Sequence, residues 1–321
     1  MSSVGRCAGR AGRGTVDPVI EINHLTKRYG RVAAVSDLSF TVRAGHVTGF
    51  LGPNGAGKST TLRMLLGLHA PTSGTATVAG RDCRSLRRAL RQVGALLDAG
   101  DVHGGRTARD HLRFLARSNA IAVGRVTEVL NEVGLAGAAD RRIGGYSLGM
   151  RQRLGIAGAL LGDPPVLLFD EPLNGLDPEG VLFVRGLFRR LAAEGRTVFV
   201  SSHLMGEMEH TADRLIVVGR GRLLADETVA QFAARGSRQC VEVRADDPSG
   251  LVAVLTAAGA QVVQSPDGLL RVTALDAVEI ARAAAERGIL LHELATRTGS
   301  LEQAFMELTG SSIEYAAGAG A

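Results

Sequence analysis

Long apolar segments, lysine and paired cysteines are all scarce in this chain of 321 residues. The longest apolar stretches, such as 166–169 and 215–218, are far shorter than the roughly 20 residues that a membrane-spanning helix needs. The amino-terminal residues include arginines but no apolar segment of the kind found in secretory signals. Cys7, Cys83 and Cys240 are far apart and form no CxxC pair, which argues against a disulfide framework or a zinc site. The sequence therefore predicts a protein that does not itself cross a membrane.

The basic side chains are almost all arginine. Lys27 and Lys58 are the only lysines among 37 Lys and Arg residues, and the net charge is +5. Because the arginines are scattered rather than gathered in one block, the charge gives little support for nucleic-acid binding, and no nucleic-acid partner is expected. With 45% hydrophobic residues the chain can bury a sizeable core, and its length suggests two domains.

The first two-thirds of the chain alternates short apolar runs with helical patterns, which is typical of an α/β domain. We expect buried strands at 47–51, 166–169 and 197–201, and helices from 58 to about 68 and around 181–193. Residues 92–162 contain amphipathic stretches, notably 108–118 and 126–133, and few strand signals. The sequence therefore predicts a helical insertion at about 92–162.

The remainder reads as a second, smaller domain. It contains an expected strand at 240–244, a helix at 249–258, two strands joined at 265–268, a helix at 276–287, a strand at 289–293 and a final helix at 301–308. Asp247 and Ser300 stand at helix-start positions. The order βαββαβ predicts a ferredoxin-like α+β module. The expected organisation is a disordered leader at 1–18, a first domain at 19–235, the module at 236–309 and a flexible tail at 310–321.

Residues 52–60 match the pattern G-x-x-x-x-G-K-[ST], between an expected strand and an expected helix. Glycines let backbone N–H groups surround phosphates, and the helix amino terminus adds partial positive charge. Lys58 would contact the β- and γ-phosphates and the Ser59 hydroxyl would bind Mg²⁺, whereas the alternative is an ordinary glycine-rich turn. The predicted phosphate-binding residues are Gly52, Pro53, Asn54, Gly55, Ala56, Gly57, Lys58, Ser59 and Thr60.

Two carboxylates, Asp170 and Glu171, follow an apolar strand pattern. Burying such a pair without a cation is costly, and a metal ion with a phosphate to hydrolyse removes that cost. Asp170 would then hold Mg²⁺ and Glu171 would act as the general base on the attacking water. Alone, the pattern is more often a strand that meets solvent, but the phosphate loop makes it specific.

The stretch from Tyr146 to Arg153 separates one family of phosphate-loop proteins from the others. It resembles the signature motif of the ATP-binding-cassette (ABC) ATPases, usually written LSGGQ, although Leu148 and Met150 depart from that pattern. The signature positions are Ser147, Leu148, Gly149 and Met150. In matching order, Tyr29 resembles the aromatic residue that stacks on adenine, Asp177 belongs to a stretch like the D-loop, and His203 resembles the switch histidine. These positions extend from residue 19 to about residue 231, roughly two-thirds of the chain.

The resemblance implies an α/β ABC ATPase cassette with a helical insertion, followed by the ferredoxin-like domain. It implies that ATP and Mg²⁺ are bound and that Lys58, Glu171 and His203 are catalytic. It also implies a homodimer that encloses two ATP molecules, each held by the phosphate loop of one subunit and the signature of the other. The tail resembles that of the export branch that includes bacitracin- and daunorubicin-resistance ATPases, which implies an ABC-2 type membrane permease as partner and a location at the cytoplasmic face of the membrane.

Asp98 departs from the family pattern. Most members have a glutamine in this loop, which contacts Mg²⁺ and couples to the membrane subunit. Asp98 lies forty residues after Lys58, the spacing expected for that loop, and some drug-exporting relatives carry an acidic residue there. We assign Asp98 as an ATP-site and Mg²⁺-site residue.

Three functions are compared. The leading one is the ATP-hydrolysing subunit of an exporter for a drug or another hydrophobic compound. The second is a soluble ABC ATPase that acts on ribosomes or DNA, but such proteins carry two cassettes or a long coiled coil, whereas this chain has one motif set and no heptads. The third is a phosphate-loop kinase or GTPase, which the signature, Asp177 and His203 argue against.

Overall fold

The computed structural model describes residues 18–100, 102–236, 240–265, 267–297 and 301–313. Residues 1–17 of the expected leader, Ser300 and most of the expected tail lie outside these residues. Pro18, expected in the leader, begins the first strand, and 310–313 belong to the last helix. The chain forms two compact units. One comprises Met1–His203 and Thr211–Leu223, and the other Leu204–His210 and Leu224–Ala321. Each unit is described by itself.

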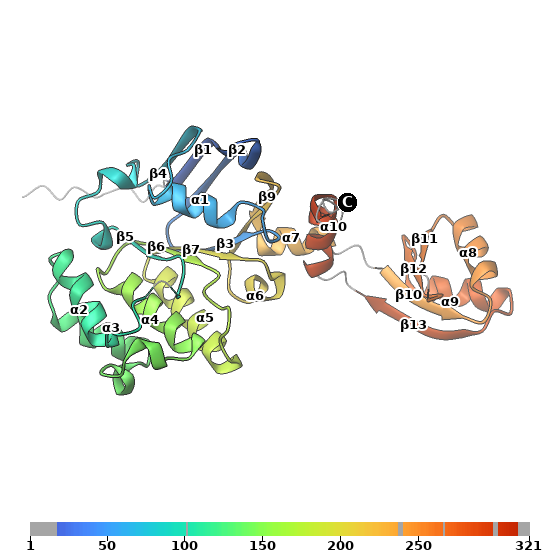
Figure 1. The fold of residues 1–321 in the computed structure, drawn as a ribbon. Helices are drawn as coiled ribbons and strands as arrows, with labels where there is room; N and C mark the ends of the chain where they lie inside the picture. The colour runs from blue at the N-terminus through green and yellow to red at the C-terminus, as the bar shows by residue number, and fades with distance from the viewer. Residues whose placement is uncertain (1–17, 101, 237–239, 266, 298–300, 314–321) are drawn as a thin grey trace, which may run out of the picture. The chain divides into compact units, whose positions relative to one another are not determined.

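The first unit contains two β-sheets (Figure 1). In the antiparallel sheet, β1 (Pro18–Tyr29) lies between β2 (Val32–Arg43) and β4 (Ser73–Val78). The second sheet has the strand order β5-β6-β7-β3-β8-β9, and its first five strands run parallel. Its strands are β3 (Val47–Leu51), β5 (Val93–Leu96), β6 (Val166–Asp170), β7 (Thr197–Ser202), β8 (Arg214–Gly219) and β9 (Arg222–Thr228), within which the division between the units falls.

The central strands are buried on both faces. Every residue of β3, β6 and β7 is buried, which explains why the sequence shows them as continuous apolar runs rather than as alternating patterns. The two sheets share a core in which Phe40 of β2 contacts Phe50 of β3 and Phe199 of β7, with ring centroids 5.5 and 5.9 Å apart. This packing fixes the antiparallel sheet beside the strands that carry the phosphate loop.

Helices connect the parallel strands and bring their carboxyl ends to one edge. The loop after β3, the acidic pair at the end of β6 and His203 after β7 all emerge at this edge. The expected strands at 47–51, 166–169 and 197–201 are therefore confirmed. The helices of the first unit are α1 (Lys58–Leu65), α2 (Ala108–Ser118), α3 (Gly124–Glu132), α4 (Leu148–Leu160) and α5 (Pro178–Ala193).

The prediction that the helical insertion begins at about residue 92 is wrong. Val93–Leu96 forms β5, which pairs in parallel with β6 in the central sheet, so the helices begin only at Ala108. Four residues are too few for a strand period to stand out in the sequence, and the pairing with β6 decides the structure. The helix expected to continue to about residue 68 ends at Leu65.

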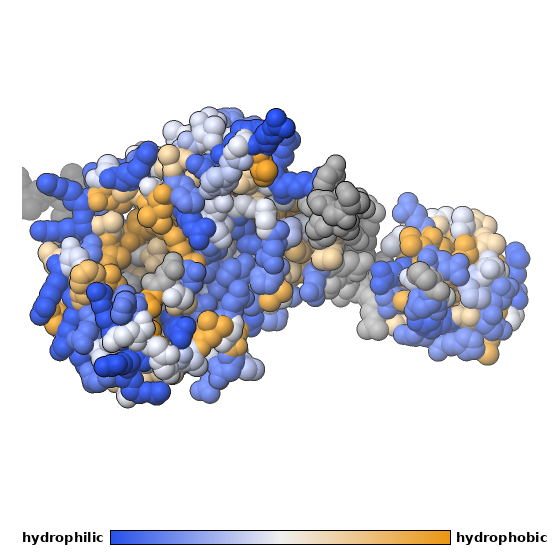
Figure 2. Space-filling view, in the orientation of Figure 1, coloured by the Kyte–Doolittle hydropathy of each residue, from blue (hydrophilic) through white to orange (hydrophobic). Residues whose placement is uncertain are grey.

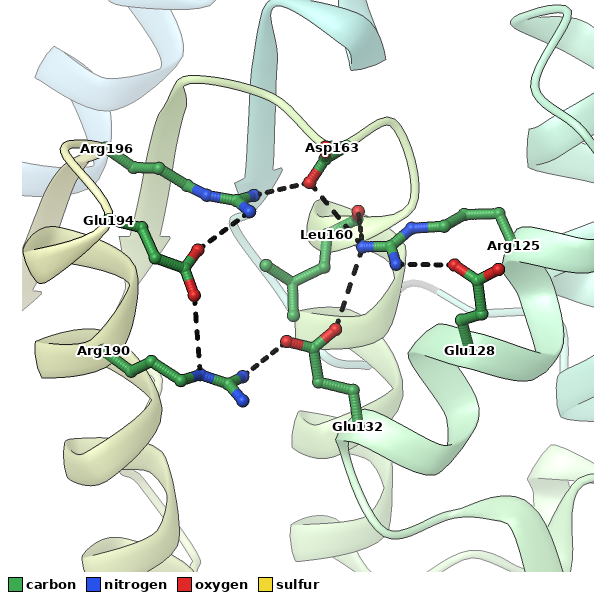
Figure 3. Close-up of polar contacts among 8 residues, drawn as sticks. All are labelled: Arg125, Glu128, Glu132, Leu160, Asp163, Arg190, Glu194 and Arg196. Carbon is green, nitrogen blue, oxygen red and sulfur yellow. Dashed lines mark hydrogen bonds and ion pairs between the residues drawn. The ribbon is translucent and has the colours of Figure 1, made fainter.

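An ion-pair network connects the helical part of the first unit to its core (Figure 3). The Glu132 carboxylate of α3 lies 2.5 Å from the guanidinium of Arg190 in α5. Arg196, directly before β7, lies 2.8 Å from Asp163, which follows α4. The network therefore stands at the amino end of β7, opposite the end that carries His203. Its members are Arg125, Glu128, Glu132, Leu160, Asp163, Arg190, Glu194 and Arg196.

The second unit contains the βαββαβ module that the sequence predicts. Its strands pair antiparallel in the order β11-β12-β10-β13, and Val241, Val243, Leu270 and Val272 are buried in its core. Asp247 caps α8 by accepting a hydrogen bond from the backbone N–H of Gly250. The elements are β10 (Cys240–Ala245), α8 (Pro248–Ala257), β11 (Gln261–Gln264), β12 (Leu270–Thr273), α9 (Ala277–Glu286) and β13 (Leu291–Arg297).

The last helix, α10 (Leu301–Ile313), packs outside the ferredoxin-like arrangement. It contacts α6 (Met205–Glu209) and α7 (Val229–Gly236) within the second unit. The module predicted at 236–309 includes most of this helix, whose side chains Leu301 and Phe305 are buried. The segments on either side of the module in the chain are therefore brought together by helix packing.

Hydrophilic residues cover most of the face drawn in Figure 2, and apolar residues occur there in separate groups. In the described part of the chain, no helix is long and apolar enough to span a membrane.

Candidate active site

The phosphate loop between β3 and α1 is shaped by close backbone contacts. A Cβ at Gly52 would lie 2.4 Å from the carbonyl oxygen of Val218, and one at Gly57 would lie 2.5 Å from that of Ala34. Gly57 also has φ of 97°, in the left-handed region that favours glycine. No side chain caps α1, so the loop leads into a helix whose first N–H groups can face an anion.

Lys58 is buried at the centre of this site, with 6% of its residue surface exposed. Its amine donates to the carbonyl oxygen of Gly52 at 2.6 Å and lies 3.4 Å from Oε1 of Glu171. Burial lowers the pKa of Lys58, while the carboxylates of Glu171 and Asp170 oppose that shift. The carbonyl contact and the nearby carboxylate together hold the amine at the mouth of the loop.

Asp170 and Glu171 are both fixed by Ser201 of β7. The Ser201 hydroxyl donates to Oδ1 of Asp170 and accepts from the backbone N–H of Glu171, the latter at 3.0 Å. Glu171 has φ of 49°, a left-handed conformation that is unfavourable for a residue with a side chain. The hydrogen bond to Ser201 helps to hold this conformation. In it, the Asp170 carboxylate contacts Ser201, while the Glu171 carboxylate contacts Lys58 and His203.

The Glu171 carboxylate bridges two further groups. Oε2 lies 2.9 Å from Nδ1 of His203 and 3.5 Å from Nδ2 of Asn174, while Oε1 faces Lys58. The side chains of Glu171 and His203 are 22% and 32% exposed, so water can reach them. The structure therefore brings together Lys58, Asp170, Glu171 and His203, which the sequence separates by as many as 145 positions.

Gln152 and Ser201 belong to this arrangement, although neither is among the site residues that the sequence predicts. Gln152 of α4 is buried, and its Nε2 lies 3.4 Å from the carbonyl oxygen of Glu171 and 3.3 Å from that of Asn174. Gln152 lies within the stretch from Tyr146 to Arg153, and its position as a polar residue on the buried side of a helix is a sequence signal that could have indicated it.

The signature stretch begins α4. The Ser147 side chain accepts from the backbone N–H of Met150 at 3.2 Å and so caps the helix. Asp177 caps α5 in the same way, by accepting from the N–H of Gly180 at 2.9 Å. Between them, a Cβ at Gly175 would lie 2.1 Å from a methyl carbon of Leu148. The signature stretch and Asp177 line one pocket of about 480 Å³, whose residues include Ser147, Leu148, Gly149, Met150 and Asp177.

Tyr29 and Asp98 have other partners in the structure. Tyr29 is 48% exposed, and its hydroxyl lies 2.9 Å from Nδ1 of His69. Asp98 is exposed, and Oδ1 accepts from the backbone N–H of Gly100 at 2.6 Å. Within the described residues, neither side chain makes a hydrogen bond or ion pair with Lys58 or Glu171, so their predicted roles depend on the family pattern alone.

The residues at the end of β6 fit a magnesium ion. Mg²⁺ prefers oxygen ligands and is commonly bound by one or two carboxylates together with substrate phosphates and waters. Asp170 offers a carboxylate and Ser59, beside the phosphate loop, offers a hydroxyl. Across the described ranges, no three or more His, Cys, Asp or Glu side chains are grouped so that they could hold a metal ion by themselves.

The chain is similar to known proteins over most of its length. The family model described as "ABC transporter" matches residues 35–174, and a domain of unknown function matches residues 239–302. The bacitracin transport ATP-binding protein of Bacillus licheniformis is 36% identical over 301 residues, covering 91% of this chain and 97% of that protein. The Nod factor export ATP-binding protein I of Burkholderia lata is 35% identical over 302 residues, covering 92% and 98%.

A solved structure of an ATP-binding subunit of an ABC transporter superposes with a TM-score of 0.62 at 26% identity, over 68% of this chain and 92% of that one. A dimeric bacterial ABC transporter cassette has the same fold, with a TM-score of 0.60 at 24% identity over 65% and 98%.

Proposed function

The chain belongs to the ABC transporter family of ATP-binding proteins, and from that premise we propose how its residues bind and hydrolyse ATP. It is the ATP-binding and ATP-hydrolysing subunit of an exporter. The observation that carries our assignment of the site is the meeting of Lys58, Asp170, Glu171 and His203 at one edge of the central sheet.

Residues 52–60 would surround the ATP phosphates with backbone N–H groups, and Lys58 would exchange its contact with Glu171 for phosphate oxygens. Tyr29, which is 48% exposed, would stack on adenine. Ser59, Asp170 and Asp98 would hold Mg²⁺, which when bound neutralises charge on the phosphates. Ser201 would keep the Asp170 carboxylate oriented through its hydroxyl.

Glu171 would take a proton from the water that attacks the γ-phosphate. His203 would hold the same phosphate through its imidazole, which already lies 2.9 Å from the Glu171 carboxylate. Lys58 would stabilise the negative charge that spreads over the phosphate oxygens in the transition state. Glu171 is held by hydrogen bonds at both its backbone N–H and its carboxylate. Its carboxylate oxygens would therefore need little reorientation to accept a proton from the attacking water.

Two subunits would enclose two ATP molecules. Ser147 to Met150 of one subunit would contact the γ-phosphate held by the other, since a capped helix start offers N–H groups and a partial positive charge. Asp177 shares a pocket with this stretch, which supports a joint role at the interface. ATP would thus favour the closed dimer and hydrolysis would release it.

The partner that carries the cargo would be a separate membrane permease of the ABC-2 type, with the chain bound at the cytoplasmic face of the membrane. Relatives named for bacitracin transport and Nod factor export support export over a role on ribosomes or DNA, and a drug or another hydrophobic compound is the proposed cargo. No nucleic-acid partner is proposed. We place the cassette at 19–235, with its helical part within 92–162, and the second domain at 236–309, which the match at 239–302 supports.

Mixing two inactive variants tests this assignment. Lys58→Ala disables the phosphate loop and Ser147→Ala disables the signature, so each homodimer should hydrolyse little ATP. A mixed dimer contains one site with both parts intact, and mixing should restore ATPase activity. Buffer-matched samples of each variant alone are the control. If the mixture stays as inactive as its components, the enclosed-dimer assignment is wrong.

A further inference from the structure

Gln152 is the one described side chain that connects the signature helix to the turn bearing Glu171 by hydrogen bonds. It lies in the second turn of α4, five residues after Ser147. Its Nε2 donates to the carbonyl oxygens of Glu171 at 3.4 Å and Asn174 at 3.3 Å. A primary amide has two N–H donors, so one hydrogen is available for each carbonyl.

The two acceptors belong to one tight turn. The backbone N–H of Asn174 donates to the carbonyl oxygen of Glu171 at 3.3 Å, and Glu171 itself has a left-handed φ of 49°. Ser201 holds this turn from the β7 side through the N–H of Glu171. Gln152 holds it from the α4 side through the carbonyl groups. A residue in an unfavourable backbone conformation keeps that conformation, and so the orientation of its side chain, only if neighbouring groups hold the peptide groups on either side of it.

Position 152 is buried, and a polar amide is less favourable there than an apolar side chain would be. Gln152 is 6% exposed, and its Oε1 is buried without a hydrogen-bond partner among the described residues. An unpaired buried polar atom costs free energy that an apolar side chain of similar size would avoid. What Gln152 provides that an apolar side chain of similar size could not is its pair of N–H donors, both of which bind the turn with Glu171.

We propose that Gln152 is a positioning residue for hydrolysis, through which the signature helix of a subunit holds that same subunit's catalytic carboxylate in place. This rests on the proposed role of Glu171 as general base and on the proposed dimer. The helix α4 is a rigid element, so a small shift of its amino end against a partner's phosphate displaces Gln152 with it. Each subunit would then adjust its own Glu171 when its signature engages the ATP held by the other.

The first experiment replaces Gln152 by methionine, which has similar length and no donor. In the full-length homodimer we expect kcat to fall by about 10- to 100-fold, as for a misplaced catalytic group, with KM for ATP within about 2-fold of the original. Thermal unfolding and ATP binding are measured on the same sample. An unchanged kcat, or a rise of KM with constant kcat, overturns the proposal.

The second experiment asks in which site Gln152 acts. Dimers are formed between one test subunit and a large excess of Glu171→Gln subunits, which bind ATP but cannot activate water, so that only one site hydrolyses. That site uses the Glu171 of the test subunit and the signature of its companion. Gln152→Met is then introduced either into the test subunit or into the companion, and phosphate release in a single turnover is recorded.

We expect the loss of rate when Gln152→Met and the working Glu171 share a subunit, and a rate within about 2-fold of the original when they do not. A loss in the opposite arrangement, or an equal loss in both, overturns the proposal, because Gln152 would then support the signature or the general fold. Ser147→Ala in the same two arrangements should give the reverse pattern. If it does not, the enclosed dimer is at fault, and the homodimer result alone decides on Gln152.

Gln152→Asn provides a second variant should the methionine protein not assemble. It keeps a primary amide in the core but shortens the side chain by one methylene, so its donors are withdrawn from the two carbonyls. The same dependence on the arrangement of subunits is expected, with a smaller loss of rate. Equal rates in both arrangements contradict the proposal for this variant too.

Discussion

Replacing Glu171 by glutamine removes the proposed general base with the least change of shape. The amide still reaches His203 and Asn174, which lie 2.9 and 3.5 Å from Oε2, but it cannot accept a proton from water. General-base catalysis contributes about 10²- to 10⁴-fold, so kcat should fall by that factor. In free energy this is about 3 to 5 kcal/mol of lost transition-state stabilisation.

The same substitution should strengthen ATP binding. Oε1 of Glu171 lies 3.4 Å from the Lys58 amine, and the two side chains are 22% and 6% exposed. At an effective dielectric constant of about 20, this attraction is about 5 kcal/mol before the cost of desolvating the pair. When the phosphates bind Lys58, they must replace the attraction between Lys58 and Glu171 that remains after the cost of desolvation. If about 1.4 kcal/mol remains after desolvation, loss of the carboxylate lowers Kd for ATP by about 10-fold.

Two measurements on one protein sample check both effects. Phosphate release gives kcat, and titration with ATP by calorimetry gives Kd. Glu128→Gln is the matched control, since it removes a carboxylate that lies 2.9 Å from Arg125 in α3, away from the phosphate loop. The control should keep both values within about 2-fold. Unchanged turnover in Glu171→Gln would refute the role as base, and weaker ATP binding would refute the competition between carboxylate and phosphate.

Two further predictions concern Asp98 and Cys83. Asp98→Gln should change the coupling of ATP hydrolysis to transport more than basal hydrolysis, measured with the permease in vesicles and with the chain alone; equal effects would make Asp98 a metal ligand only. Burial raises the pKa of Cys83 to about 11, so at pH 7.5 its thiol should be alkylated far more slowly than an unfolded one, with the rate rising as pH approaches 11. Fast labelling at pH 7.5 of Cys83 in a Cys7→Ser, Cys240→Ser protein would contradict this burial.

Features that depend on neighbouring residues could be predicted from the sequence. The phosphate loop, the acidic pair and the three central strands are local patterns, and the structure has strands at 47–51, 166–170 and 197–202. The βαββαβ order was predictable for the same reason, since Asp247 and the turn near residue 268 mark the ends of its elements.

Features that depend on distant pairing could not be predicted. β5 contains only Val93–Leu96, and these residues form a strand because they pair with β6, which follows in the chain only after a long helical segment. Ser201 and Gln152 act through hydrogen bonds to residues that are 30 and 19 positions away. A serine at a strand end and a glutamine in a helix are common in any sequence, and only the folded arrangement gives these two their place beside Glu171.

The second domain is built as a separate module, which limits what it can contribute. It has its own core, and Lys58, Asp170, Glu171 and His203 all precede it in the chain, so it supplies none of the proposed catalytic groups. The sheet buries its apolar side chains under α8 and α9, while charged side chains alternate with them along the strands and pair across the opposite face. These pairs are Arg271 with Glu242, and Arg244 with Glu293 and Asp267. Removing such paired charges from water is costly, so a partner that binds this face must match its alternating charges rather than bury an apolar surface.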